Sequence, residues 1–243
     1  MAPPMELEHD HTRKAIRERL AAENRPNYAR DFVYGGIDGA VTTFAVVAGV
    51  QGAELPAGIV VIMGLANLLA DGLSMAASNY SGTKTEIDDF ERIRQIEHRH
   101  IAVAPEGERE EVRQILAAKG LSGHALEEAV AAITRDRDIW TAFMLTEEYG
   151  LATTQRSPVR AAAATFMAFA LCGAVPLVPY VAGMPQSFTL AAIATGLTFL
   201  GIGSFKSRWS LQPWWQSAME TFSIGTAAAV VAYAVGWLLR GLA

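Results

Sequence analysis

Apolar and polar positions follow one another in long blocks along this chain of 243 residues. Each apolar block is about as long as the roughly 20 residues that an α-helix needs to cross a bilayer. Two of them come early and three come late, at 32–51, 56–80, 159–182, 187–205 and 214–239. The pattern therefore predicts five transmembrane helices.

A polar segment at 81–156 separates the second apolar block from the third. From Lys84 to Arg156 it contains fifteen acidic and ten basic residues. Because no proline occurs there before Pro105, the second transmembrane helix is expected to continue into this segment. Shorter helices are expected at 106–119, after an N-cap at Ser122, and at 136–149. The predicted fold is an all-α membrane protein with a helical domain inserted between the second and third spans.

The blocks divide the chain into four parts, and the basic residues orient them. The parts are an N-terminal segment at 1–30, spans one and two at 31–80, the inserted domain at 81–156, and spans three to five at 157–243. Basic residues in short flanking segments mark the cytosolic side of a membrane protein. They gather before the first span and after the fourth, at Arg13, Lys14, Arg17, Arg19, Arg25, Arg30, Lys206 and Arg208. We therefore expect a cytosolic N-terminus, a cytosolic inserted domain and a C-terminus on the opposite side, with Arg240 the single base against this.

Composition narrows the classes of function. Hydrophobic residues make up 51% of the chain and charged residues only 19%, below the roughly one quarter of a soluble domain. The net charge of −5 argues against a nucleic-acid partner. No apolar stretch within the first 30 residues suggests a cleavable signal peptide. All five histidines lie outside the predicted spans, so no intramembrane catalytic set favours an enzyme.

Polar side chains inside the first two spans are the main functional signal. The second span has three of them and a thioether at four-residue spacing, which places all four on one helix face: Asn67, Asp71, Met75 and Asn79. A neighbouring face carries only small residues, and we expect another helix to pack there: Ala66, Ala70, Ser74 and Ser78. The first span contains Asp38. A charged carboxylate at bilayer depth costs at least about 2.5–3.5 kcal/mol and is by default a functional residue.

These spans contain no Lys or Arg as a counter-ion, so a metal ion or a proton is the expected partner. Carboxylate and amide oxygens suit Mg²⁺, Ca²⁺ or Mn²⁺, whereas a thioether ligand from Met75 favours a softer ion such as Fe²⁺ or Co²⁺. A structural alternative stays open, in which Asp38 caps a helix, Asp71 bonds a neighbouring helix and Met75 only packs. Glu220, in the fifth span, is a candidate proton site or a helix-packing acid.

The inserted domain offers a second candidate metal site. Its potential ligands occur in pairs that share a helix face: Glu97 with His100, Glu108 with Glu111, and Met144 with Glu148, with Glu147 alongside. Packed together, these faces would hold metal ions through oxygen, nitrogen and sulfur ligands. The alternative is a solvated charged surface in which nearby arginines pair with the acids, namely Arg94, Arg99, Arg109 and Arg113.

Two long stretches resemble a known family. Residues 34–49 (YGGIDGAVTTFAVVAG) and 64–80 (GLANLLADGLSMAASNY) resemble the first-span and second-span signatures of the vacuolar iron transporter family. The motifs PEGE at 105–108 and EEYGL at 147–151 are similar to parts of its cytosolic segment. The resemblance covers about residues 28–240.

The resemblance implies five spans, a homodimer, and proton-coupled export of Fe²⁺ from the cytosol. Mn²⁺ and related first-row ions such as Zn²⁺ or Co²⁺ are expected as further cargo, and no separate cofactor is expected. The destination would be a vacuole in a fungus or plant, and the far side of the inner or plasma membrane in a bacterium. A membrane-anchored metal sensor or scaffold without transport is the alternative function.

Site residues also follow from the resemblance. Asp38 and Met75 match the ligands of the translocation path, and Asn67 and Asp71 lie in the same signature. The cytosolic metal-binding positions are matched by Glu97, Glu108, Glu111, Met144 and Glu148. His100 stands where a glutamate is expected, a departure that would change the metal preference or add a pH response. Ser81-Gly82-Thr83 also departs from the family pattern, after the second span.

Overall fold

All regular secondary structure is helical in the part described by the computed structural model, which comprises residues 10–22, 26–152 and 155–242. No strand occurs in these ranges, so the all-α prediction is confirmed. Residues 1–9 and 23–25 of the predicted N-terminal segment lie outside them. The elements are α1 (Arg13–Ala21), α2 (Ala29–Gly52), α3 (Ala57–Val103), α4 (Pro105–Ala118), α5 (Gly123–Ile133), α6 (Arg137–Glu147), α7 (Pro158–Ala174), η1 (Val175–Leu177), α8 (Val178–Val181), α9 (Ser187–Lys206), η2 (Ser207–Trp209), α10 (Trp214–Leu239) and η3 (Arg240–Leu242).

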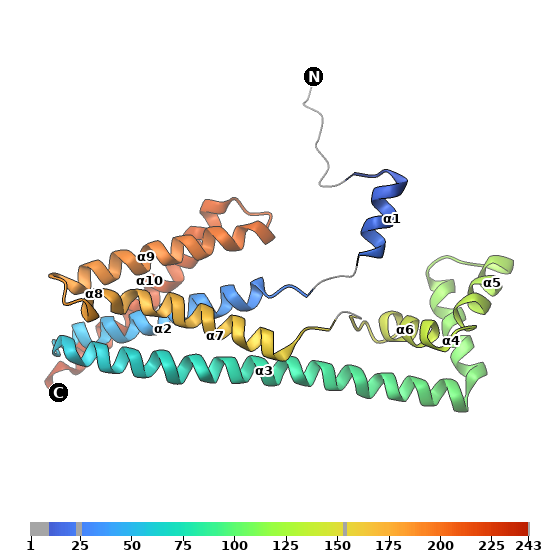
Figure 1. The fold of residues 1–243 in the computed structure, drawn as a ribbon, viewed down its shortest axis with the longest axis horizontal. Helices are drawn as coiled ribbons and strands as arrows, with labels where there is room; N and C mark the ends of the chain where they lie inside the picture. The colour runs from blue at the N-terminus through green and yellow to red at the C-terminus, as the bar shows by residue number, and fades with distance from the viewer. Residues whose placement is uncertain (1–9, 23–25, 153–154, 243) are drawn as a thin grey trace, which may run out of the picture.

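Five helical stretches are long and apolar enough to cross a membrane, as the hydrophobic blocks predicted. The second of them, α3, is a single helix of 47 residues that extends along the whole length of the molecule (Figure 1). At 1.5 Å per residue it is about 70 Å long, more than twice the thickness of the hydrocarbon core of a bilayer. It ends at Val103, just before Pro105 begins α4. The predicted continuation of the second span beyond the apolar block is therefore confirmed.

Helix α2 lies at the centre of the apolar bundle and packs against α3, α7, α9 and α10. Its contact with α7 is close because glycines face that helix. A Cβ atom built on Gly39 would lie 2.3 Å from the carbonyl oxygen of Phe169, and one on Gly35 would lie equally close to the carbonyl oxygen of Thr165. Only a residue without a side chain fits at these two positions, so the sequence of α2 fixes how near α7 comes.

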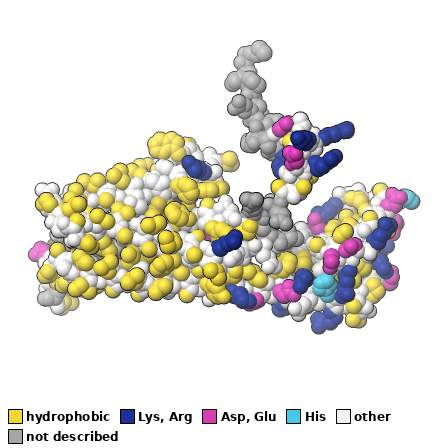
Figure 2. Space-filling view, in the orientation of Figure 1, with side chains coloured by type: hydrophobic (Ala, Val, Ile, Leu, Met, Phe, Trp, Pro, Cys, Tyr) yellow, Lys and Arg dark blue, Asp and Glu magenta, His cyan; other side chains and the backbone are white. Residues whose placement is uncertain are grey.

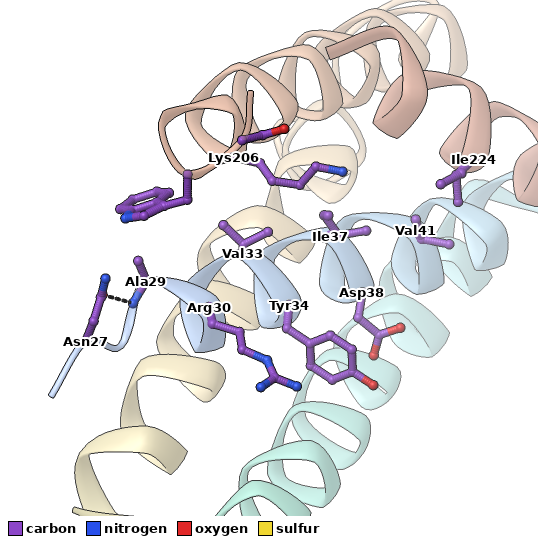
Figure 3. A pocket seen from close by; sticks show the side chains of 12 residues that line it. Asn27, Ala29, Arg30, Val33, Tyr34, Ile37, Asp38, Val41, Lys206 and Ile224 are labelled. Atoms are coloured by element: carbon purple, nitrogen blue, oxygen red, sulfur yellow. Dashed lines mark hydrogen bonds between the residues drawn. The ribbon is translucent and has the colours of Figure 1, made fainter. Parts of the chain in front are cut away.

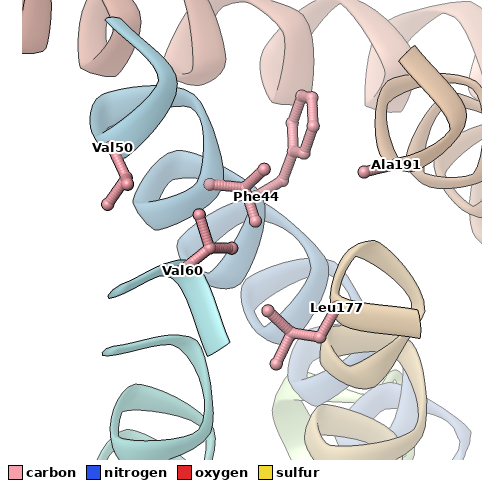
Figure 4. Packing of buried hydrophobic residues seen from close by; sticks show 6 residues of the cluster. Phe44, Val50, Val60, Leu177 and Ala191 are labelled. Carbon is pink, nitrogen blue, oxygen red and sulfur yellow. The ribbon is translucent and has the colours of Figure 1, made fainter. Parts of the chain in front are cut away.

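An apolar cluster closes the end of the bundle away from the polar helices (Figure 4). It brings together side chains from α2, α3, η1 and α9: Phe44, Val47, Val50, Val60, Leu177 and Ala191. The third span changes direction beside this cluster. Helix α7 stops at Ala174, and a 3-10 turn containing Pro176 leads into the short helix α8. The regular α-helix of this span therefore ends early, where the prolines begin.

The polar helical unit, defined as residues 84–149, occupies the other end of the molecule, where most charged side chains gather (Figure 2). It contains the C-terminal part of α3 and helices α4, α5 and α6. Its interior is a second apolar cluster: Ile101, Val112, Leu116, Val130, Trp140 and Met144. Gly120 ends α4 in a left-handed conformation with φ +94°, and the Asp136 carboxylate caps α6 by accepting from the backbone N–H groups of Asp138 and Ile139.

No helix of the described chain covers the face of α3 on which we expect another helix to pack, so packing there by a second copy stays a prediction. The small-residue face of α3, comprising Ala66, Ala70, Ser74 and Ser78, is exposed. Helix α3 instead packs against α7 and η1 through Gly64, Leu68 and Gly72, which lie on a different face. The physical reason is space, since these glycines admit Leu177 and Phe169 directly onto the helix backbone.

Candidate metal sites

The first candidate site is built where α3 turns into α4. Glu97 and His100 lie three residues apart, so they occupy one face of α3. The chain turns sharply at Ala104 between α3 and α4, which places Glu108 of α4 near that face. Nδ1 of His100 lies 3.4 Å from Oε1 of Glu108 and 3.9 Å from Oε1 of Glu97. One potential ligand atom from each of the three residues lies within 4.8 Å of the others, a spacing suited to a single metal ion.

Both glutamates of this cluster are buried. Glu97 is 1% exposed and Glu108 is 5% exposed. The hydroxyl of Tyr149 donates to Oε1 of Glu97 at 3.0 Å, whereas Oε2 of Glu97 and Oε2 of Glu108 have no hydrogen-bond partner among the described residues. Buried carboxylate oxygens without a partner carry a large desolvation cost. A bound cation would remove that cost for both oxygens.

The electrostatics of the cluster favour the binding of a proton or a cation. Burial, followed by repulsion from Glu97, Glu111 and Glu148, raises the pKa of Glu108 to about 7. Burial and the charges of Glu97 and Glu111 likewise raise the pKa of Glu148. Burial and the hydrogen bond to Glu97 raise the pKa of Tyr149. Several carboxyl groups therefore share one small volume that favours neutral or metal-bound forms.

The arginines do not neutralise this cluster, although the charged-surface alternative expects them to. Arg94 pairs with Glu91, Arg109 pairs with Glu106 and stacks over Trp140, and Arg113 pairs with Glu110 and Glu127. Within the described ranges, no Lys or Arg forms an ion pair with the cluster or its acidic neighbours Glu111 and Glu148. A solvated charged surface therefore accounts for the acids that pair with these arginines. It does not account for the buried carboxylates of Glu97 and Glu108.

Not every predicted ligand joins the cluster. Glu111 and Glu148 are exposed and lie near enough to act on Glu108 electrostatically. Met144 is fully buried in the apolar cluster of the unit. Glu147 faces away and pairs with Lys119 at 2.5 Å. Tyr149, which sequence reasoning missed as a site residue, had one signal: it follows Glu148 in the family-like motif at 147–151.

The second candidate site is a cavity of about 530 Å³ among α2, α3 and α7. Asp38 of α2 and Met75 of α3 both line it, together with Ser74, Ser78 and Asn79. Two of the four residues that the sequence predicted for a membrane path thus come from different helices to one cavity. Asn67 and Asp71 do not line it. The Asn67 amide donates instead to the hydroxyl of Thr42 at 3.4 Å, and Asp71 interacts electrostatically with Asp38.

Another cavity, of about 760 Å³, lies on the other flank of α2 (Figure 3). Asp38 lines this cavity and also the cavity of about 530 Å³. Arg30, Tyr34 and Asp38 project from one side of α2, at four-residue spacing, whereas Val33 and Ile37 project from the other side toward Lys206 and Ile224. The three polar side chains line both cavities. Asp38 therefore stands at the meeting point of a polar cavity and a mainly apolar one.

A buried polar network that lines the cavity of about 530 Å³ was not predicted. Asp31 is 5% exposed, accepts from the Asn79 amide at 2.9 Å and pairs with Arg156. Asn79 also lies 2.6 Å from the hydroxyl of Thr165 in α7. The only sequence signal for this network was Asn79, as the last member of the polar stripe.

Two further acids have basic partners. Lys206 donates to Oε2 of Glu220 at 3.0 Å, so the predicted proton site has an ion-pair partner at the start of the fifth span. Glu54 and Arg240 pair at 3.1 Å near the other end of the bundle. Both pairs join positions that are distant in sequence.

Comparisons with known proteins agree with this architecture. A sequence profile of the VIT family matches residues 29–237. The chain is 30% identical over 207 residues to Vacuolar iron transporter 1 of Oryza sativa subsp. japonica, covering 84% of this chain and 82% of that protein. It is 32% identical over 234 residues to the Vacuolar iron transporter of Toxoplasma gondii, covering 90% and 78%, and 31% identical over 217 residues to Vacuolar iron transporter 1 of Arabidopsis thaliana, covering 87% and 86%. This chain is an integral membrane protein that belongs to the vacuolar iron transporter (VIT) family.

Proposed function

We propose that this chain exports Fe²⁺, with Mn²⁺ and related first-row ions as further cargo, from the cytosol across a membrane in exchange for protons. The observation that carries the proposal is the cavity between α2 and α3, where the Asp38 carboxylate and the Met75 thioether line one space. One hard and one soft ligand type together suit a borderline ion such as Fe²⁺. The names of the relatives, which specify iron transport, support the same cargo.

The polar helical unit is proposed to be cytosolic and to collect the ion. Basic residues near the start of α2, at the end of α9 and before α7 lie on the side of the bundle that this unit extends from, in agreement with the rule for cytosolic flanks (Figure 1). Arg240, the base that opposed this orientation, pairs with Glu54 at the far end. Arg240 is a single base at that end, against several basic residues at the end from which the polar helical unit extends.

A homodimer is proposed to complete the path. The small-residue face of α3 is exposed, and such faces allow the close approach of a second helix in a membrane. A second copy packed there would bring its own Asp38 and Met75 near the shared axis, because these residues line a cavity next to that face. Two residue types would then supply four ligands.

Proton exchange is proposed from the chemistry of the carboxylates. A metal ion and a proton compete for the same carboxylate oxygens, so loading the ion releases a proton and unloading it takes one up. Asp38 is the carboxylate placed to do this in the membrane. Glu220 is a less favoured proton site, because Lys206 already neutralises it.

The test is flux through the purified protein in proteoliposomes that contain a pH-sensitive dye. Wild type should move Fe²⁺ and Mn²⁺ with an opposite proton movement, and Asp38→Asn should abolish both. Glu54→Gln, which removes an acid at the far end of the bundle, is the matched control and should transport like wild type. Tight metal binding with no flux in wild type would overturn the proposal and favour a sensor or scaffold.

A further inference from the structure

The cluster between α3 and α4 mixes two kinds of donor atom. Two are carboxylate oxygens, from Glu97 and Glu108, and the third is an imidazole nitrogen, from His100. We propose that His100 binds the metal ion through its ring nitrogen and makes this site select borderline first-row ions over Mg²⁺, Ca²⁺ and Mn²⁺. The inference rests on the proposed function, because it concerns which ions the chain collects for transport.

The position of the ring supports a ligand role. Nδ1 of His100 lies on the same side as Oε1 of both glutamates, at 3.4 and 3.9 Å. These are separations that a cation between the three atoms would shorten by small side-chain rotations. The His100 side chain is 46% exposed, whereas the two carboxylates are almost completely buried. The imidazole therefore lies at the side where an ion arrives, with the carboxylates behind it.

The unpaired carboxylate oxygens are a second, independent sign that this cluster binds a cation. Oε2 of Glu97 and Oε2 of Glu108 are buried and accept no hydrogen bond in the described part of the chain. A protonated His100 could pair with the Oε1 atoms, yet the Oε2 atoms would stay without a partner. A metal ion can take oxygens from both carboxylates and the imidazole nitrogen together. The donor arrangement is thus better explained by coordination than by an ion pair.

His98 shows what a non-coordinating histidine looks like in the same helix. Its Nδ1 lies 3.5 Å from the hydroxyl of Thr141, and its backbone carbonyl accepts from Arg137 at 2.6 Å. Two residues along α3 turn its side chain away from the glutamates by about 160°. The chain therefore contains a control histidine two residues away on the same helix, although His98 is less exposed than His100.

The chemistry of imidazole gives this substitution a consequence for selectivity. An all-carboxylate site suits the hard ions Mg²⁺, Ca²⁺ and Mn²⁺, whereas imidazole suits Fe²⁺, Zn²⁺ and related ions. Replacing a carboxylate by a neutral ring also removes one negative charge, which lowers the affinity for hard ions that bind mainly by charge. His100 would thus lower competition from the abundant hard cations.

The direct test is pulsed electron paramagnetic resonance of the full-length protein loaded with one equivalent of Mn²⁺ after labelling its histidines with ¹⁵N. Wild type should show a histidine nitrogen coupled to the ion. His100→Glu should lose that coupling, and His98→Glu should keep it. A coupling that persists in His100→Glu, or is absent from a wild type that binds Mn²⁺, would overturn the inference.

Competition between ions gives a second readout. We expect His100→Glu to reduce the preference for Co²⁺ over Mn²⁺ by about tenfold, the scale on which changes around a metal site alter affinity. His98→Glu should leave the preference unchanged. An unchanged preference in His100→Glu would overturn the inference even if the proteoliposomes transport Fe²⁺. Nitrogen coordination in a protein that gives no flux would uphold it while refuting the transport proposal.

Discussion

The side-chain amide of Asn79 in α3 donates a hydrogen bond to Oδ1 of Asp31 in α2, over 2.9 Å. The same carboxylate pairs with Arg156, which lies just before α7, and the amide also lies 2.6 Å from the hydroxyl of Thr165 inside α7. One buried network therefore connects the three helices that surround the Asp38 cavity. It also anchors the segment that returns from the polar helical unit to the membrane.

The first prediction concerns this network. Arg156→Ala should destabilise the protein by about 3 kcal/mol, because removing one partner of a buried ion pair leaves the other charge without compensation. Thermal unfolding of the detergent-solubilised protein measures the effect. Arg160→Ala, which removes an exposed arginine one turn into α7, is the control and should change stability little. Equal stability of both variants would show that the Asp31 pair contributes nothing, and adding Asp31→Asn to Arg156→Ala should recover part of the loss.

The five spans, the long second helix and the residues that share a helix face could be predicted from the sequence. These depend on local rules, namely the length of apolar blocks, the position of prolines, and i,i+3 or i,i+4 spacing. Glu97 and His100 were placed together for this reason, and so was the stripe that contains Met75. Asp38 and Met75 were brought to one cavity only by the resemblance, since nothing local specifies how two helices rotate against each other.

The remaining features depend on packing between distant segments. Asp31 and Arg156 are separated by 125 residues, and no periodicity links them. The ion-pair partner of each arginine was equally unpredictable, because a long side chain can contact any of several acids nearby. The exposed small-residue face had a local signal for packing, but the signal does not say whether the partner helix belongs to the same chain.

The second prediction tests the close contact between α2 and α7. Gly39→Ala should destabilise the protein by about 1–3 kcal/mol, because the added methyl group would overlap the backbone of Phe169. Gly201→Ala in α9 is the matched control, since no atom lies within 4 Å of the Cβ position there. It should leave stability unchanged or raise it by up to about 1 kcal/mol, the usual gain of Ala over Gly in a helix. A stable Gly39→Ala protein would mean that the two helices separate easily.

The third prediction tests the proposed dimer. In a Cys172→Ser background the chain has no cysteine, so single cysteines can be introduced without interference. Ala70→Cys, on the small-residue face of α3, should form an intermolecular disulfide under mild oxidation, because that face brings two Cα atoms within about 7 Å. Ile193→Cys, which is exposed on α9, should not. Electrophoresis without reductant measures the fraction of disulfide-linked dimer. A dimer band from Ile193→Cys but not from Ala70→Cys would place the interface elsewhere.

The fourth prediction concerns the thioether in the membrane cavity. Met75→Leu keeps a side chain of similar volume, so packing and stability should change little. It removes the soft ligand, and Fe²⁺ transport should therefore fall by about tenfold while Mn²⁺ transport falls less. Competitive uptake of the two ions into proteoliposomes measures the ratio. An equal loss for both ions would assign Met75 a packing role rather than a part in discriminating the ions.

The last prediction concerns the pH dependence of the polar helical unit. The pKa of Glu108 rises from 4.5 to about 7 on folding, so the folded unit holds this proton more tightly than the unfolded chain. The resulting stabilisation is complete below about pH 4.5 and is lost as the pH rises through about 7. In the presence of a chelator, unfolding followed through the buried Trp140 should thus occur at lower temperature at about pH 8 than at about pH 5.5.

Metal ions should reverse this trend, because they replace the proton on Glu108. Added Fe²⁺ or Mn²⁺ should raise the unfolding temperature strongly at about pH 8 and weakly at about pH 5.5, where protons compete for the carboxylate. Glu108→Gln removes the titrating group and should flatten the pH dependence, whereas Glu111→Gln, an exposed neighbour, should preserve most of it. A metal effect that grows toward acid pH would contradict carboxylate coordination at this site, since protonation can only weaken such ligands.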